Sequence, residues 1–325
     1  MLRMNHWMTI VIAAALSGCW DYEQCPTPAD LGTERLPGHL SETGLYADIT
    51  AGTLAADVLP YKPQFELWSD GAEKQRWILL PKDKRIDTKD MDAWVFPEGT
   101  KLWKEFRRDG VRVETRLFQK VGPSDDDWVG IAYVWAADQS DATATPSGAA
   151  NALGTNHDVP NAGQCVGCHA GRKSRILGFS AIQLSASATD GAIDLEGLIA
   201  NDRLSNPPER NFSVPGNETE RAALGYLHAN CSHCHNQNRP ETDGPRCFDP
   251  RKDVDFGLYV SDLRSTADTA AYRTGADYFE PGDSEGSRLV ELVARRGDDK
   301  HMPPLATEKV DEDGVELLRM WIDGM

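Results

Sequence analysis

The hydrophobic positions of residues 61–140 follow a period of two. Aromatic and β-branched runs such as "RWILL", "AWVF" and "WVGIAYVW" are separated by turn residues, and Asp109-Gly110 lies between two alternating runs. This alternation is typical of half-buried strands, and Asp-Gly between two of them indicates a tight hairpin. We therefore predict about five to seven short antiparallel strands with no helix between them, as in a sandwich or barrel.

Helical spacing replaces this alternation in the last third of the chain. Asn217 and Glu220 have nearly the spacing of a capping box, which marks the start of a helix. Apolar residues then recur on one helical face in three segments: Ala223, Leu224 and Leu227; Leu289, Leu292 and Val293; and Val315, Leu318, Trp321 and Ile322. We predict three helices, the first of which runs into Cys231.

Composition and charge limit the kinds of molecule that we expect this protein to bind. The chain has 325 residues, enough for about two domains. Its 34 Lys and Arg against 51 Asp and Glu give a net charge of −17, and phosphate binding needs clustered cations. We therefore expect no nucleic-acid partner, and an acidic surface favours basic docking partners instead.

The first residues, "MLRMNHWMTIVIAAALSGCW", have the pattern of an export signal. One basic residue, Arg3, precedes an apolar run from Met8 to Leu16 that is too short to span a bilayer. The segment "LSGC" resembles the bacterial lipobox, in which the cysteine is lipidated and becomes the first residue of the mature protein. The resemblance implies a signal peptide at 1–18 and a lipid anchor at Cys19. Cleavage to a soluble form is the alternative.

Four of the seven cysteines form two Cys-x-x-Cys-His groups, "CVGCH" at 165–169 and "CSHCH" at 231–235. This pattern is the attachment signature of c-type haem. Two thiols one turn apart reach the two vinyl groups of one haem edge, and the next histidine is the proximal iron ligand. The predicted sets are Cys165 and Cys168 with His169, and Cys231 and Cys234 with His235. The pattern leaves His233 as an unspecified spacer, and it predicts two covalently bound haems.

Two other interpretations of the cysteines fit less well. A zinc ribbon places its second cysteine pair roughly 15 to 20 residues after the first, whereas Cys168 and Cys231 are much farther apart in the sequence. A thioredoxin-type pair lies in a βαβ unit, which the pattern of this chain does not contain. Haem attachment also takes place outside the cytoplasm, in agreement with the export signal.

The segment from residue 211 onward resembles a class I cytochrome c domain. The helix before "CSHCH", the loop "GDDKHMPPLATEKVDEDG" and the last helix carry the resemblance. It implies that Ala223 and Leu227 lie where the first and last helices cross, and that Met302 is the distal iron ligand. A methionine ligand raises the reduction potential relative to a second histidine. His301 is the competing ligand.

The sequence does not identify the distal ligand of the first haem iron, on the side opposite His169. His157 precedes Cys165 on a loop, and His228 lies on the helix that leads to the second motif. Either histidine is a candidate, as are Met91, water or no ligand at all. A solvated surface position is an equal alternative for both histidines.

Much of the chain from about residue 65 onward resembles a group of bacterial dihaem c-type cytochromes with a strand-rich N-terminal half. The stretches include "FELWSDGAEKQRWI", "FPEGTKLWKEF", "VPNAGQCVGCH", "YLHANCSHCHN" and "MPPLATEKVDEDGVELLRMWI". The resemblance implies two haems c and an extracytoplasmic location.

We therefore expect an α+β multidomain fold, with an antiparallel β-sandwich or barrel-like N-terminal domain and an all-α cytochrome c-like C-terminal domain. The expected parts are a lipoprotein signal peptide at 1–18, a tether at 19–60, a β-rich domain at 61–140, a linker at 141–160, a first haem-binding segment at 161–210 and a cytochrome c-like domain at 211–325.

Cys25 and Cys247 lie outside both motifs. An exported protein permits a disulfide between them, and two unpaired thiols are the alternative, because sequence spacing cannot establish pairing.

Two classes of function remain. The first is electron transfer between periplasmic or membrane redox proteins by a dihaem cytochrome anchored on the periplasmic side of the outer or inner membrane. The second is a dihaem peroxidase-like oxidoreductase with an open distal face on the first haem. That enzyme needs an acid-base residue over the iron, and the sequence identifies none. Electron transfer is the favoured expectation.

Overall fold

The computed structural model describes residues 31–237, 253–298, 300–305 and 307–325. The expected signal peptide, Cys19 and Cys25 lie outside the described residues, as does Cys247. The predicted lipid anchor and the predicted disulfide therefore stay predictions.

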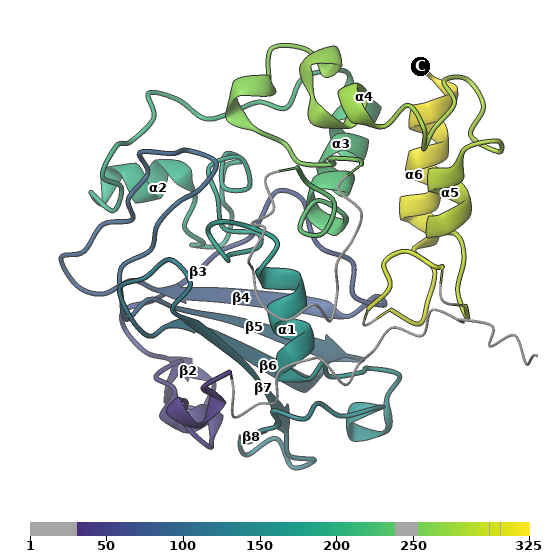
Figure 1. Ribbon diagram of the computed structural model, residues 1–325. Helices are drawn as coiled ribbons and strands as arrows, with labels where there is room; N and C mark the ends of the chain where they lie inside the picture. The colour runs from purple at the N-terminus through teal and green to yellow at the C-terminus, as the bar shows by residue number, and fades with distance from the viewer. Residues whose placement is uncertain (1–30, 238–252, 299, 306) are drawn as a thin grey trace, which may run out of the picture.

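One open antiparallel sheet forms the lower half of the molecule (Figure 1). Its six strands follow one another in sequence order: β3 (Val58–Pro60), β4 (Glu73–Leu79), β5 (Lys101–Arg108), β6 (Val111–Lys120), β7 (Trp128–Trp135) and β8 (Ala142–Ala144). A separate two-stranded ribbon pairs β1 (Tyr46–Asp48) with β2 (Thr53–Leu54). A sheet in simple up-and-down order needs only local connections, which the turn residues between the runs provide.

Both faces of the sheet are buried, because successive side chains of each strand point to opposite sides. Trp77, Trp103 and Trp135 belong to an apolar cluster with the N-terminal segment, which contains the short 3-10 helices η2 (Thr33–Arg35) and η3 (Leu40–Glu42). Ile78 and Leu102 point to the other face and pack with the segment that contains α2 (Leu195–Ala200). This second face is the one that borders the site described below.

The hairpin predicted at Asp109-Gly110 is confirmed. It joins β5 to β6, with Arg108 opposite Val111. Asp109 has a φ of 49° and Gly110 a φ of 78°, the left-handed values that a two-residue hairpin turn of the primed type requires.

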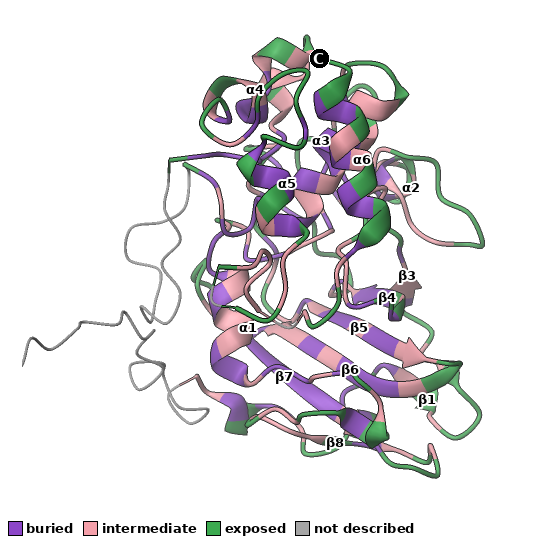
Figure 2. Cartoon of the chain, turned by 90° about the vertical axis from the view of Figure 1, so that its right-hand side faces the viewer, coloured by how far each residue is buried: buried purple, intermediate pink, exposed green. Residues whose placement is uncertain are grey.

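The C-terminal part lies above the sheet and contains four short helices (Figures 1 and 2). They are α3 (Glu218–Asn230), α4 (Ala270–Thr274), α5 (Arg288–Val293) and α6 (Glu312–Asp323), with the 3-10 helices η5 (Val260–Asp262) and η6 (Thr266–Asp268) between them. The predicted capping box is confirmed, since Asn217 and Glu220 bond to each other's backbone, and α3 ends at Cys231. The predicted buried face of the last helix is also confirmed: Val315, Leu318, Trp321 and Ile322 are all buried.

Helices α3 and α6 pack against each other. Ala223 and Leu227 of α3 are fully buried in one cluster with Leu318 and Trp321 of α6. In α5, Leu289 and Val293 face this cluster as expected, whereas Val290 is buried in place of the expected Leu292.

The expected fold class is wrong. The chain is a mixed α/β structure with one open sheet; the sheet is not a closed barrel, and the C-terminal part is not an all-α domain. Helices α4 and α5 have only 5 and 6 residues, and irregular chain connects them. The segments between these helices have no regular helical backbone. Their apolar side chains are nevertheless part of the core. The sheet is open: its two short edge strands, β3 and β8, lie at opposite ends and do not pair with each other.

Among the described residues, no helix has the length and apolar character needed to cross a bilayer.

The turn at Asp109-Gly110 gives a direct test of the sheet. We expect Gly110→Ala to lower the free energy of unfolding by about 1 kcal/mol, because alanine at a positive φ carries strain that glycine avoids. Urea unfolding followed by circular dichroism measures the change. Gly38→Ala is the matched control, since Gly38 is exposed and has free space around the added Cβ, without a positive φ. Equal losses in both variants would contradict the turn geometry.

Candidate functional site

The first Cys-x-x-Cys-His motif forms a helix of its own, α1 (Ala162–His169). Asn161 caps it by accepting a hydrogen bond from the Gln164 amide at 3.0 Å, and the Gln164 side chain accepts one from the Asn161 amide at 2.9 Å. This capping box fixes a helix of 8 residues, in which Cys165 and Cys168 lie one turn apart.

Helix α1 packs on the sheet at a glycine of β7. A Cβ added to Gly130 would lie 3.7 Å from the Cβ of Cys165 and 2.8 Å from the ring of Phe118. Gly130 therefore makes room for both the helix and the ring. Glycine inside a strand commonly marks such a close approach.

His169 is held in one orientation. Its Nδ1 donates a hydrogen bond to the Arg175 carbonyl oxygen at 2.6 Å, because a carbonyl can only accept. Its ring also packs on Phe118, with the ring centroids 4.2 Å apart. Burial lowers the pKa of His169 to about 4, so the ring is neutral and its Nε2 carries a lone pair. This is the arrangement that protein environments give to a metal-binding histidine.

A cavity that opens to solvent adjoins this helix. Residues of three regions border the cavity: Cys165, Cys168 and His169 from α1; Arg76, Lys104 and Arg116 from the sheet; and His228, Ser232 and His233 from the end of α3 and the second motif.

Three cations form a row across the sheet on the cavity side. Arg76 of β4 lies directly opposite Lys104 of β5, and Lys104 lies directly opposite Arg116 of β6. Glu66 pairs with Arg76 at 3.1 Å, and Glu114 pairs with Arg116. Lys104 has no ion-pair partner within the described part of the chain. Burial, together with the two guanidinium groups, holds the pKa of Lys104 well below its usual value. An anionic group in the cavity next to Lys104 would oppose these effects and favour the charged ammonium.

Glu114, on the same strand as Arg116, forms a hydrogen bond with His157. The Glu114 carboxylate has no exposed area, and it accepts hydrogen bonds from Arg116 Nε at 2.5 Å and from His157 Nε2 at 2.7 Å. Burial alone would raise the pKa of Glu114, but Arg116 and the bond to His157 outweigh it and hold the pKa below its usual value. His157 is therefore buried, and its Nε2 is directed at Glu114 and not at an iron.

His228 has the opposite tautomer to His169. Its Nδ1 accepts a hydrogen bond from the Leu258 amide at 3.0 Å and lies 3.3 Å from an Arg172 nitrogen, and both of these groups can only donate. The proton of the neutral ring is therefore on Nε2. In this state Nε2 is a donor toward the cavity, which disfavours His228 as an iron ligand.

The two motifs are in direct contact. Asn236, which follows the second motif, donates a hydrogen bond to the Gly171 carbonyl at 3.0 Å, and Arg172 donates one to the Ser232 hydroxyl. The segments just after His169 and His235 are therefore bonded to each other.

The second motif begins at the end of α3, where Cys231 is the C-terminal cap and Cys234 is buried. Cys231 and Met302 both pack against the apolar cluster of α3, α5 and α6. The Met302 amide donates to the Leu292 carbonyl at 3.0 Å, whereas His301 bonds the Asp298 carbonyl through Nδ1. The structure thus brings Met302 and Cys231 to one apolar cluster. The cavity lining does not include Cys231, Cys234 or His235.

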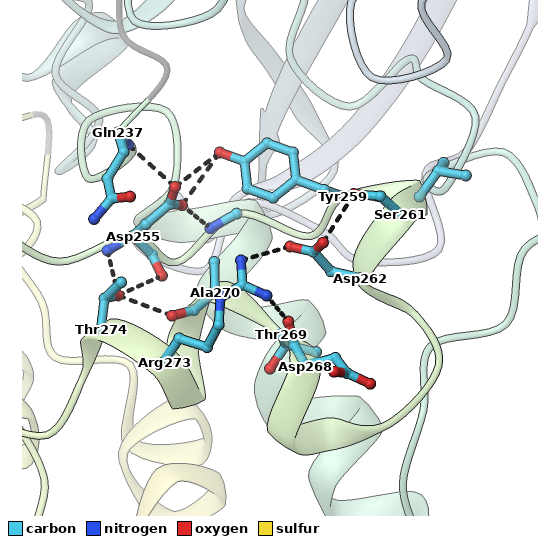
Figure 3. A network of polar contacts seen from close by, with 12 residues as sticks. Gln237, Asp255, Tyr259, Ser261, Asp262, Asp268, Thr269, Ala270, Arg273 and Thr274 are labelled. Carbon is cyan, nitrogen blue, oxygen red and sulfur yellow. Dashed lines mark hydrogen bonds and ion pairs between the residues drawn. The ribbon is translucent and has the colours of Figure 1, made fainter.

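A buried polar network holds the chain beside the second motif (Figure 3). The Asp255 carboxylate accepts hydrogen bonds from the Gln237 amide at 3.1 Å and from the Tyr259 hydroxyl at 3.0 Å. The Thr274 hydroxyl of α4 accepts one from the Asp255 amide at 2.8 Å. Next to it, the Phe256 amide donates to the His235 carbonyl at 3.0 Å. The network therefore fixes the backbone on which His235 lies.

The motif thiols do not have the chemistry of a redox-active pair. Burial raises the pKa of Cys165 to about 12, and it does the same for Cys231. A redox-active cysteine pair needs a lowered thiol pKa. Among the described residues, no three His, Cys, Asp or Glu side chains converge to hold a metal ion. A haem iron needs only two axial ligands from the protein, because the porphyrin supplies the other four.

His233 is the residue that the sequence pattern does not reveal. It occupies a spacer position of the second motif, yet it is only 8% exposed and borders the cavity of the first motif. The only signal in the sequence is the local density of histidine around it. The cation row is likewise hidden, because its members come from three strands.

No protein-family model, curated protein or solved structure matches this chain.

The buried Glu114 carboxylate should make the free energy of unfolding depend on pH. Glu114→Gln leaves the Arg116 cation without its buried partner, and we expect a loss of about 3 kcal/mol in the free energy of unfolding at pH 7. A carboxylate with a lowered pKa stabilises the fold above its unfolded pKa of 4.5, and this stabilisation is lost as the pH falls below that value. The variant should therefore show a flatter decline in stability below pH 4.5.

Urea unfolding at a series of pH values measures both effects. The exposed Glu98 provides the control, since Glu98→Gln should change the stability by less than about 0.5 kcal/mol. A Glu114→Gln protein with the pH profile of the unaltered chain would show that the carboxylate does not stabilise the fold.

Proposed function

We propose that this protein is an extracytoplasmic dihaem c-type cytochrome that transfers electrons between redox partners. One haem is attached at Cys165 and Cys168, and the other at Cys231 and Cys234. The observation that carries the proposal is the first motif: two thiols one turn apart and a histidine with a free Nε2 lone pair border one cavity.

The first site fits a haem in two respects. His169 is neutral, and its second nitrogen is bonded to a carbonyl, as a proximal ligand requires. Lys104, between Arg76 and Arg116, has no ion-pair partner among the described residues and could pair with a propionate carboxylate of the haem. The haem supplies the one-electron chemistry, while these residues attach it, orient it and balance its charge.

At the second site, His235 is the proposed proximal ligand and Met302 the proposed distal ligand. Packing of Met302 and Cys231 against one apolar cluster supports this pair. A dry, apolar environment and a methionine ligand both raise the reduction potential of a haem iron.

The contact between the motifs supports electron transfer as the function. The bonds of Asn236 to Gly171 and of Arg172 to Ser232 keep the two attachment sites side by side. Two haems held at these sites would supply one-electron chemistry within a single chain. The net charge of −17 favours redox partners with basic docking surfaces. A lipid anchor at Cys19 would keep the chain at a membrane of the periplasm.

Haem counting tests the proposal. When the full chain is exported from a bacterium that attaches haem c, we expect two covalent haems per chain. The double variant Cys165→Ala with Cys168→Ala should retain one, and so should Cys231→Ala with Cys234→Ala, because each motif binds its own haem. Intact mass and the pyridine haemochrome absorbance give the number.

The double variant Cys25→Ala with Cys247→Ala is the control, since both residues lie outside the motifs, and it should retain two haems. An unaltered chain that leaves the cytoplasm without covalent haem would refute the proposed function. Low-spin ferric spectra that do not respond to peroxide or cyanide would exclude a peroxidase-like activity.

The distal ligand of the second site has its own test. Met302→Leu keeps the volume of the side chain but removes the sulfur, so we expect the loss of the methionine-to-iron charge-transfer band and a lower potential for one of the two haems. Met320→Leu is the control, because Met320 is 52% exposed on α6. If the band persists in Met302→Leu, then the ligand is another residue, and His301 is the first alternative.

A further inference from the structure

His233 has the properties of a ligand that the first site lacks. Its side chain is buried at 8% exposure, and its Nδ1 has no hydrogen-bond partner among the described residues. It borders the same cavity as Cys165, Cys168 and His169.

His169 belongs to α1 and His233 to the second motif, so two separate chain segments each bring a histidine to this cavity.

The other histidines at this cavity are engaged elsewhere. His157 directs Nε2 at the buried Glu114 carboxylate at 2.7 Å. His228 accepts a backbone hydrogen bond at Nδ1, so its Nε2 carries the proton. Met91 also borders the cavity, where it packs against the apolar cluster around Trp94 and Phe96, and it is the remaining competitor.

We propose that His233, a spacer residue of the second motif, is the sixth ligand of the iron of the haem attached at the first motif. This inference rests on the proposed function, because it requires a haem at Cys165 and Cys168. Each motif then contributes to the first haem: α1 supplies the thioether links and His169, and the second motif supplies the ligand on the other face.

These ligand sets would also order the two potentials. If His169 and His233 hold the first iron and His235 and Met302 the second, the first would have the lower reduction potential, so electrons would pass from the first site to the second.

Spectra of the dihaem protein test the ligand. In the unaltered protein we expect two low-spin ferric haems, one with a bis-histidine and one with a histidine-methionine signature in electron paramagnetic resonance and near-infrared magnetic circular dichroism. His233→Ala should convert one haem to high spin while the haem count stays at two, and added imidazole should restore the low-spin signal. A purely structural role for His233 would not give recovery by imidazole.

Three further variants make the result decisive. His233→Met should produce a second methionine-to-iron band and raise the lower of the two potentials, and it decides the question if His233→Ala does not accumulate. His228→Gln and Met91→Leu, at the same cavity, should leave both haems low-spin. Two low-spin haems in His233→Ala, no new band in His233→Met, or a spin change in Met91→Leu would each overturn the assignment. If the unaltered protein carries two covalent haems, any of these three outcomes rejects the ligand assignment but not the proposed function.

Discussion

The hydrogen bonds between the two Cys-x-x-Cys-His segments are the constraint on which the rest of the site depends. Asn236 bonds the Gly171 carbonyl, and Arg172 bonds Ser232, so chain segments that are distant in sequence meet just after each proximal histidine. Ser232 and His233 of the second motif border the cavity of the first, whereas Cys231, Cys234 and His235 do not. A change in the backbone at one motif would displace side chains at the other.

The sheet contributes charge and shape to the same cavity. Period-two alternation sends Trp103 to the apolar cluster beneath the sheet, while Lys104 faces the cavity. Cross-strand register then places Lys104 between Arg76 and Arg116, and Lys104 is the one of the three without an ion-pair partner among the described residues. Gly130 lets α1 approach the strands closely. The strand-rich half of the chain therefore contributes one wall of the proposed first haem site.

Local signals in the sequence predicted local structure well. The Asp109-Gly110 hairpin, the capping box of Asn217 and Glu220 and the buried face of α6 all depend on interactions within a few residues. The prediction of an all-α C-terminal domain was wrong: it rested on three helical stretches and on the resemblance to a class I cytochrome c domain, whereas irregular loops connect these helices. Those loops are fixed by contacts such as the Asp255 network, whose partners are far apart in sequence. Periodicity cannot reveal such contacts.

The sequence by itself determined the attachment chemistry that we propose, since the spacing of Cys165, Cys168 and His169 is local and was recognisable without a fold. It could not decide between the histidines opposite His169. That choice depends on which ring nitrogen of each histidine is already hydrogen-bonded. Glu114 accepts a hydrogen bond from Nε2 of His157, and the Leu258 amide donates one to Nδ1 of His228. These partners come from other elements of the fold. Only the tertiary structure brings them to the cavity, and only it turns His233 from a spacer into a buried side chain beside the first motif.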